Sequence, residues 1–228
     1  MGGYWLVFFI VPMLLGIIVQ SKLKSTFARN ARVAVASGLT GAEVARRILD
    51  SNGLGDVQVL VSKAGPLSDH YDPRTRTVSL SEPVYRGRSI AATAVAAHEV
   101  GHAIQHARAY VPMRARTAIW PVAAFSSQAW MFFLIGGFLF QTAGGYNTTF
   151  LWIAVILYLF AVLFQIVTLP VEFNASSRAK EQVATLGLAS GQEQEGVGAT
   201  LTAAALTYVA GALAALLQLL YLFLLARD

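Results

Sequence analysis

Residues 150–169 read FLWIAVILYLFAVLFQIVTL and contain no charged side chain. A helix needs about 17–25 mainly apolar residues to cross the hydrocarbon core of a bilayer, so this stretch predicts a transmembrane helix. Three other stretches have the same character, at 4–19, 118–141 and, approximately, 197–226. The pattern predicts a mainly α-helical, multi-pass membrane protein with about four transmembrane helices.

The composition agrees with a membrane protein and excludes some kinds of site. Of the 228 residues, 56% are hydrophobic and 13% are charged, whereas soluble globular domains carry about 25% charged residues. The chain has no cysteine, so a transition metal would have to be held by His, Asp or Glu. The basic residues stand singly and are not interleaved with aromatic residues, which argues against a nucleic-acid partner.

The basic residues also predict the orientation in the bilayer. Residues 21–117 hold 14 of the 17 lysines and arginines, at positions 22, 24, 29, 32, 46, 47, 63, 74, 76, 86, 88, 108, 114 and 116. Basic loops stay on the cytoplasmic side. We therefore expect a transmembrane helix within 1–20, a cytoplasmic region at 21–117, two transmembrane helices within 118–169, a cytoplasmic helix within 170–196, and a fourth transmembrane helix within 197–228.

The region 21–117 is the candidate for a small folded α+β domain. Thr40 and Glu43 form a capping-box pattern, which predicts a helix over 41–51. Further expected elements are strands at 57–61 and 76–81, paired as a short β-ribbon, and a helix over 89–109. After Pro170, which should end or kink the third span, we expect a helix over 171–186 and then a polar loop at 190–196.

Residues 98–102 read His-Glu-Val-Gly-His, an H-E-x-x-H motif within the predicted helix 89–109. Positions i and i+4 share one helix face, so His98 and His102 can bind one Zn²⁺ ion. Zinc lowers the pKa of a water that it binds, and Glu99 can accept the proton as the water attacks a carbonyl. The motif therefore predicts a zinc hydrolase with Glu99 as its catalytic base.

The spacing of residues does not identify the third zinc ligand as clearly as it identifies His98 and His102. His106 lies about 12 Å along the helix from His98, so it cannot share an ion with both other histidines and is interpreted as an ordinary polar residue. His70 or a carboxylate remains, and Glu172 is the best candidate. Small residues at 175, 176 and 179 would let its helix approach the motif helix closely. Glu172 could equally cap its own helix.

Several segments together resemble the YugP-like neutral zinc metallopeptidase family of bacterial membrane proteins. They are GLTG (38–41) with EVA (43–45), LSDHYDP (67–73), VSLS (78–81), AAHEVGHAIQ (96–105) and LPVEFNAS (169–176). The resemblance implies a multi-pass peptidase of the bacterial plasma membrane with a zincin-like catalytic domain. It also implies Glu172 as the third metal ligand.

One position departs from the wider gluzincin class, which the second ligand helix also resembles. In that class an Asp follows the ligand Glu and hydrogen-bonds a ligand histidine. This chain has Ser176 there, and a serine hydroxyl can make the same contact more weakly.

On the substrate side, residues 69–73 (DHYDP) favour a turn. The alternative is that His70 or Tyr71 acts in catalysis by stabilising the oxyanion or bounding the pocket. The strand edge at 78–81 could pair with an extended peptide. Expected partners are the lipid bilayer and protein or peptide substrates, including membrane-associated ones, and no oligomeric state is assigned.

Three other functions compete with a membrane endopeptidase. A site-2-type intramembrane protease is disfavoured because the spans contain no Asp, and a metal transporter because no span carries an ionisable residue. A non-catalytic zinc-binding scaffold or regulator stays open, since the ligands alone would serve it.

Overall fold

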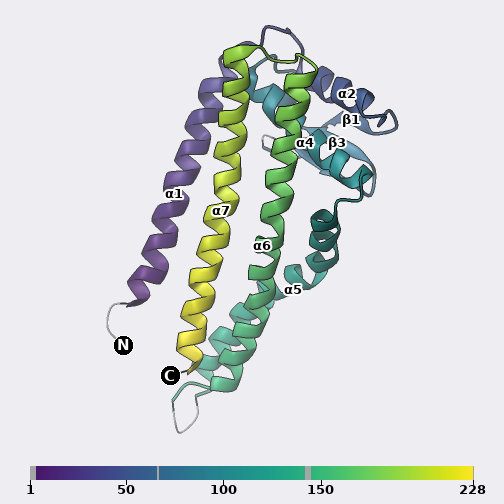
Figure 1. Ribbon diagram of the computed structural model, residues 1–228. Helices are drawn as coiled ribbons and strands as arrows, with labels where there is room; N and C mark the ends of the chain where they lie inside the picture. Colours follow the sequence, from purple (N-terminus) through teal and green to yellow (C-terminus); the bar gives the residue numbers. More distant parts are fainter. Residues whose placement is uncertain (1–3, 66, 142–144, 228) are drawn as a thin grey trace. The chain divides into compact units, whose positions relative to one another are not determined.

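The computed structural model describes residues 4–65, 67–141 and 145–227. Its elements follow the order α1 (Tyr4–Ala31), α2 (Gly41–Ser51), β1 (Gln58–Val61), β2 (His70–Asp72), β3 (Thr77–Leu80), α3 (Glu82–Tyr85), α4 (Ile90–Ala107), α5 (Val111–Leu139), α6 (Thr148–Thr185) and α7 (Gly191–Arg227) (Figure 1). The mainly helical class with a small sheet is confirmed.

The chain divides into two compact units. A helical unit comprises Met1–Ile18, Arg114–Leu169 and Tyr208–Asp228, and a mixed unit comprises Val19–Met113 and Pro170–Thr207. Helices α1, α5, α6 and α7 contribute residues to both units.

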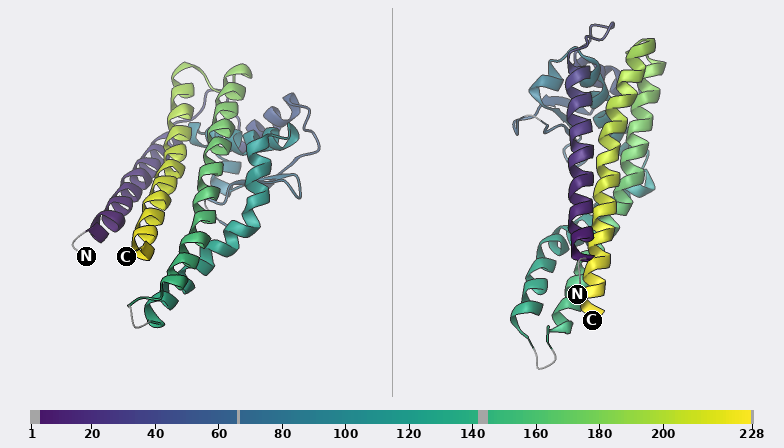
Figure 2. Two further views of the ribbon diagram at one scale, coloured as in Figure 1. Left: turned by 60° about the horizontal axis from the view of Figure 1, so that its bottom comes forward. Right: turned by 90° about the vertical axis from the view of Figure 1, so that its left-hand side faces the viewer.

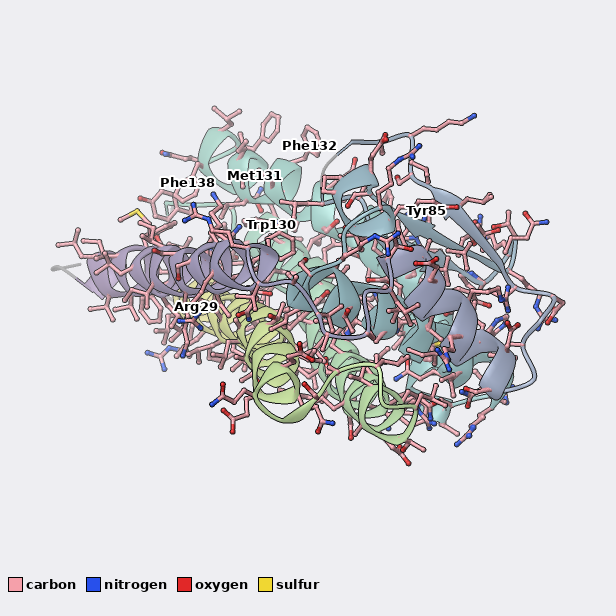
Figure 3. The ribbon with its side chains drawn as sticks, turned by 90° about the horizontal axis from the view of Figure 1, so that it is seen from above. Arg29, Tyr85, Trp130, Met131, Phe132 and Phe138 are labelled. Atoms are coloured by element: carbon pink, nitrogen blue, oxygen red, sulfur yellow. The ribbon has the colours of Figure 1, made fainter. Side chains whose placement is uncertain are left out.

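Four described helices are long and apolar enough to cross a membrane, namely α1, α5, α6 and α7. In the helical unit, α6 and α7 lie side by side (Figure 2), with Leu151 and Val155 in one apolar cluster with Leu222. Aromatic side chains such as Phe132 project from α5 (Figure 3), and Phe132 is 74% exposed. Exposed apolar surface of this kind suits a lipid environment and is costly in water.

Pro170 was expected to end or kink the third span, and the structure shows that α6 does not end there. Proline removes one backbone donor and crowds the carbonyl four residues earlier, but long apolar helices tolerate it where other groups compensate. The Tyr110 hydroxyl donates a hydrogen bond to the Pro170 carbonyl oxygen at 3.4 Å, but the acceptor that loses its backbone donor is the carbonyl of Ile166, four residues earlier. The predicted helix over 171–186 is therefore the continuation of the third span, and it ends before Gly187, whose φ is +61°.

The predicted polar loop at 190–196 is wrong, because α7 already begins at Gly191. The Glu193 carboxylate accepts two hydrogen bonds from Ser190, one from the backbone N–H at 2.7 Å and one from the side-chain hydroxyl at 2.9 Å. Ser190 and Glu193 repeat the spacing of Thr40 and Glu43, whose capping box opens α2 as predicted. The same signal at Ser190 marks the start of α7.

The sheet has three strands in the order β1-β3-β2. Both predicted strands are present, but β1 and β3 pair in parallel rather than as a ribbon. The antiparallel partner of β3 is β2, which forms where a turn was favoured. Strand β3 is consequently central, so the edge at 78–81 is not open to a peptide. A parallel pair requires a crossover, and the segment that carries β2 supplies it.

The apolar core of the mixed unit lies between the sheet, α2, α4, the part of α6 after Pro170 and the first part of α7. Fully buried members include Ile48, Val78, Val100, Val171 and Val183. This core sets α4 against the later part of α6, and both helices carry predicted metal ligands.

Candidate metal centre

Helix α4 presents His98 and His102 on one face. Its N-terminus is capped by Ser89, whose hydroxyl accepts a hydrogen bond from the Ala92 backbone N–H. The helix is buried along most of its length, and its two histidine rings lie with centroids 4.8 Å apart and planes at 86°. The spacing predicted from the motif is thus realised in a helix held rigidly by the core.

Glu172 reaches the histidines from α6, 74 residues away in sequence from His98. Its Oε2 atom lies 3.2 Å from His98 Nε2 and 3.6 Å from His102 Nε2. One ligand atom from each of the three residues falls within 4.8 Å of the others. Glu172 is 2% exposed, so its carboxylate is buried beside the two imidazoles and shielded from solvent.

The close approach of α4 and α6 depends on Gly101. A β-carbon at position 101 would lie 2.6 Å from the Ala175 carbonyl oxygen, inside van der Waals contact. Any larger residue at 101 would therefore push the helices apart. Ala175 and Ala179, two of the small residues singled out on the Glu172 face, are buried as expected.

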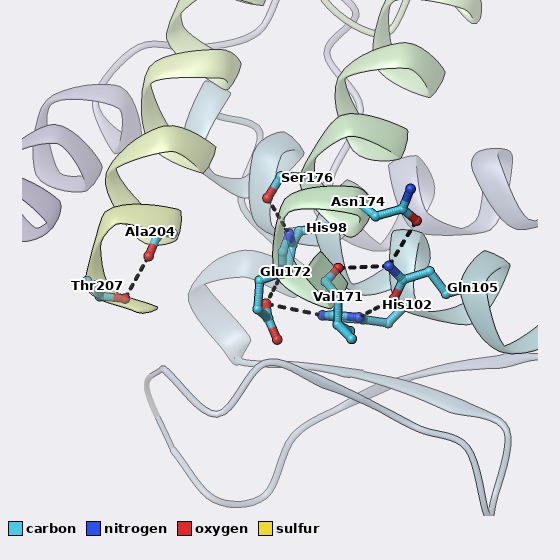
Figure 4. A network of polar contacts seen from close by, with 9 residues as sticks. All are labelled: His98, His102, Gln105, Val171, Glu172, Asn174, Ser176, Ala204 and Thr207. Atoms are coloured by element: carbon cyan, nitrogen blue, oxygen red, sulfur yellow. Dashed lines mark hydrogen bonds and ion pairs between the residues drawn. The ribbon is translucent and has the colours of Figure 1, made fainter. Parts of the chain in front are cut away.

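The Nδ1 atom of each histidine has a partner of its own (Figure 4). His98 Nδ1 lies 3.2 Å from the Ser176 hydroxyl, the contact anticipated at the position of the gluzincin Asp. His102 Nδ1 lies 3.0 Å from Gln105 Oε1. With both Nδ1 atoms occupied, the Nε2 atoms remain to face Glu172 and an ion.

The charges of the cluster favour a cation. Burial by itself lowers the pKa of His102, but the hydrogen bond and charge of Glu172, together with the charge of Glu99, raise it above the usual value. Glu99 is buried and lies one residue after His98. Two imidazoles and one carboxylate, converging in a buried place, form a donor set of catalytic zinc sites, which leave a fourth position for water.

The other predicted site residues lie elsewhere on the mixed unit. His70 is on β2, exposed, with Nδ1 2.8 Å from the Ser68 carbonyl oxygen. Tyr71 is buried against α4, and its hydroxyl lies 2.8 Å from His106 Nδ1. Neither belongs to the group of potential ligands found among the described residues. His106, interpreted as an ordinary polar residue, is the partner of Tyr71.

Sequence reasoning missed Gln105 and Asn174. Gln105 is fully buried between the two ligand helices, and Asn174 accepts a hydrogen bond from its amide at 3.0 Å. A signal was available, because a glutamine three residues after a ligand histidine lies on the same helix face.

Comparisons with known proteins identify a family of zinc metallopeptidases. A family described as "Putative neutral zinc metallopeptidase" matches residues 5–227. "Putative membrane protease YugP" of Bacillus subtilis (strain 168) is 50% identical over 212 residues, which cover 92% of this chain and 92% of that protein. No solved structure matches the chain significantly.

The helix contact at Gly101 can be tested by adding one methyl group. We expect Gly101→Ala to separate α4 from α6 and to weaken zinc binding by at least tenfold, because His98 and Glu172 would no longer share an ion. Zinc affinity is measured by chelator competition on protein purified in detergent.

Gly198→Ala is the matched control, since it adds the same methyl group within α7 and meets its nearest described neighbour only at 3.9 Å. Both substitutions gain about 1 kcal/mol of helix propensity. Unchanged zinc affinity in Gly101→Ala would show that the contact does not govern the site.

Proposed function

The chain belongs to the neutral zinc metallopeptidase family, and we propose that it is a zinc-dependent membrane endopeptidase with Glu99 as its general base. In this proposal His98, His102 and Glu172 bind one Zn²⁺ ion. The observation that carries it is the convergence of ligand atoms from α4 and α6 to within 4.8 Å.

Alternative roles for Glu172 are weakened by its surroundings. A carboxylate that only capped a helix would sit at a helix N-terminus, but Glu172 lies inside α6, twenty-four residues after Thr148. A carboxylate that is 2% exposed also needs a compensating charge. In the proposed site, a cation that it shares with the two imidazoles provides that charge.

The residues divide the chemistry of peptide hydrolysis among them. When bound, Zn²⁺ would supply Lewis acidity toward water and the substrate carbonyl. Glu99 accepts a proton from the attacking water and returns it to the nitrogen of the leaving amine. Ser176 and Gln105 contact the Nδ1 atoms of the two imidazoles. These contacts keep the rings in their orientation during turnover.

We further propose that the active site faces the cytoplasm and accepts protein or peptide substrates, including membrane-associated ones. The support is the concentration of basic residues in 21–117 and the position of Glu172, three residues after the predicted end of the third span. Both features support a proposed site next to the bilayer on the cytoplasmic side.

The main test separates an enzyme from a zinc-binding scaffold. We expect Glu99→Gln to bind zinc like the wild type and to lower kcat on a casein-type substrate by roughly 10²- to 10⁴-fold. His98→Ala, His102→Ala and Glu172→Gln should each lose zinc, as measured by elemental analysis. Removal of zinc by a chelator should abolish cleavage, and added zinc should restore it.

Glu181→Gln serves as the control, because Glu181 is an exposed carboxylate of α6. Full cleavage by Glu99→Gln would exclude Glu99 as the base. Wild-type protein that binds zinc but cleaves nothing would favour the scaffold or regulator.

Of His70 and Tyr71, we propose that Tyr71 bounds the substrate site, since it packs on α4 one turn beyond His102 and contacts His106. Tyr71→Phe keeps the packing and removes the hydroxyl, so KM should rise several-fold while zinc content stays constant. His70→Ala should change neither KM nor kcat by more than about twofold. The reverse order of effects would assign the role to His70.

The orientation can be tested because the chain has no cysteine. Single substitutions Thr148→Cys and Lys63→Cys place thiols at exposed positions. Thr148 lies between the predicted spans 118–141 and 150–169, on the side that the proposed topology makes external, and Lys63 lies in the predicted cytoplasmic region. A membrane-impermeant maleimide should label Thr148→Cys in intact cells and Lys63→Cys only after permeabilisation. Labelling in the opposite order would invert the proposed topology.

A further inference from the structure

We infer that Gln105 is a positioning residue that sets the tautomer of His102 and locks it to the helix that carries Glu172. The inference rests on the proposed zinc site and adds a residue that acts through His102 rather than on substrate. It follows from a complete accounting of the hydrogen bonds that the buried Gln105 amide makes (Figure 4).

The orientation of the amide is fixed by its partners on α6. One end of the Gln105 side chain lies 2.8 Å from the Val171 carbonyl oxygen, which can only accept a hydrogen bond. The atom facing it must therefore be the amide nitrogen, Nε2. The second Nε2 hydrogen points to Asn174 Oδ1 at 3.0 Å, so both donors are satisfied.

The remaining amide atom determines the state of His102. Gln105 Oε1 lies 3.0 Å from His102 Nδ1, and a carbonyl-type oxygen cannot donate. His102 Nδ1 must therefore carry the hydrogen. In the neutral ring this leaves the lone pair on Nε2, the atom that lies 3.6 Å from Glu172.

The contact on His98 is different in kind. Its Nδ1 faces the Ser176 hydroxyl at 3.2 Å, and a hydroxyl can either donate or accept. Ser176 thus tolerates both tautomers of His98, whereas Gln105 permits one tautomer of His102. Among the described contacts to the two ring Nδ1 atoms, only the one at His102 selects a metal-binding tautomer.

The same amide joins the two ligand helices. Val171 precedes Glu172, and Asn174 follows it by two residues, so both acceptors of Gln105 flank the third proposed ligand. Asn174 Oδ1 also accepts a hydrogen bond from Arg178 Nε at 2.8 Å, which fixes the amide oxygen toward Gln105. A displacement of α6 would break these bonds and release His102 at the same time.

A purely structural role for Gln105 makes a contrary prediction. If the residue only filled the core, an apolar side chain of similar size would be tolerated better than a charged one. If it positions His102, an oxygen acceptor at this place matters more than apolarity. The variants Gln105→Met and Gln105→Glu therefore separate the two roles by the order of their effects.

The experiment measures zinc affinity by chelator competition in the purified full chain. We expect Gln105→Met to raise the zinc Kd by about 10- to 100-fold, as loss of a group that orients a ligand usually does. Gln105→Glu keeps an acceptor for the Nδ1 hydrogen but loses the amide donors to Val171 and Asn174. Its zinc Kd should therefore lie between that of the wild type and that of Gln105→Met. Ser177→Ala, at an exposed position on α6, should match the wild type.

A second readout does not depend on zinc or on activity. Two-bond ¹H–¹⁵N spectra of the metal-free protein, which has 4 histidines, report the tautomer of each neutral ring. His102 should carry its hydrogen on Nδ1 in the wild type and shift toward the other tautomer in Gln105→Met. This readout decides the matter even if Gln105→Glu fails to fold.

The outcomes distinguish this inference from the proposed function. Folded Gln105→Met with the wild-type tautomer and zinc affinity would overturn the role of Gln105 and leave the zinc site intact. Tighter zinc binding by Gln105→Met than by Gln105→Glu would assign a core-filling role. Wild-type protein that binds no zinc while His102 keeps its hydrogen on Nδ1 would refute the proposed function alone.

Discussion

The contact between Gly101 and the backbone of Ala175 is the constraint on which the site depends. Two helices normally pack with axes 8–10 Å apart, depending on the side chains between them. With no β-carbon at position 101, α4 and α6 can approach to backbone contact. That approach brings Glu172 Oε2 within 3.2 Å of His98 Nε2. The site therefore requires a glycine at position 101 as well as the three side chains that converge.

Close packing explains why so much polarity can be buried there. Glu172, His102, Gln105 and Ser176 are all largely withdrawn from solvent, and each would be costly alone. Each has a partner across the α4–α6 contact. Ser176 contacts His98, and Gln105 donates hydrogen bonds to Val171 and Asn174. Such a network is stable only when complete, so the surrounding apolar core must hold both helices in register.

Membership of the neutral zinc metallopeptidase family fits a chain that combines this site with four helices able to cross a membrane. Helix α6 is common to both parts, because it passes Pro170 without ending and continues to Glu172. The third span and the third proposed ligand are thus residues of one helix.

Local patterns in the sequence were sufficient to predict most of the helices and the shared face of the two histidines, because these depend on residues that are close in sequence. Uninterrupted apolar stretches predicted the four long helices, the Thr40–Glu43 capping box predicted the start of α2, and the i, i+4 spacing predicted that His98 and His102 share a face. The residues at 57–61 and 76–81 predicted two strands. They could not predict the parallel pairing of these strands or the central place of β3, because pairing joins segments that are distant in sequence.

Tertiary structure alone decided the rest. Pro170 is a local signal for the end of a helix, yet α6 continues through it to Thr185, and its later residues pack in the core of the mixed unit. The start of α7 at Gly191 is not of this kind, because the local pattern of Ser190 and Glu193 marks it. Glu172 could be either a cap or a ligand on spacing, and only its position against α4 places it beside both imidazoles. The role inferred for Gln105 required coordinates, because a hydrogen-bond partner is selected by distance in space and not by separation along the chain.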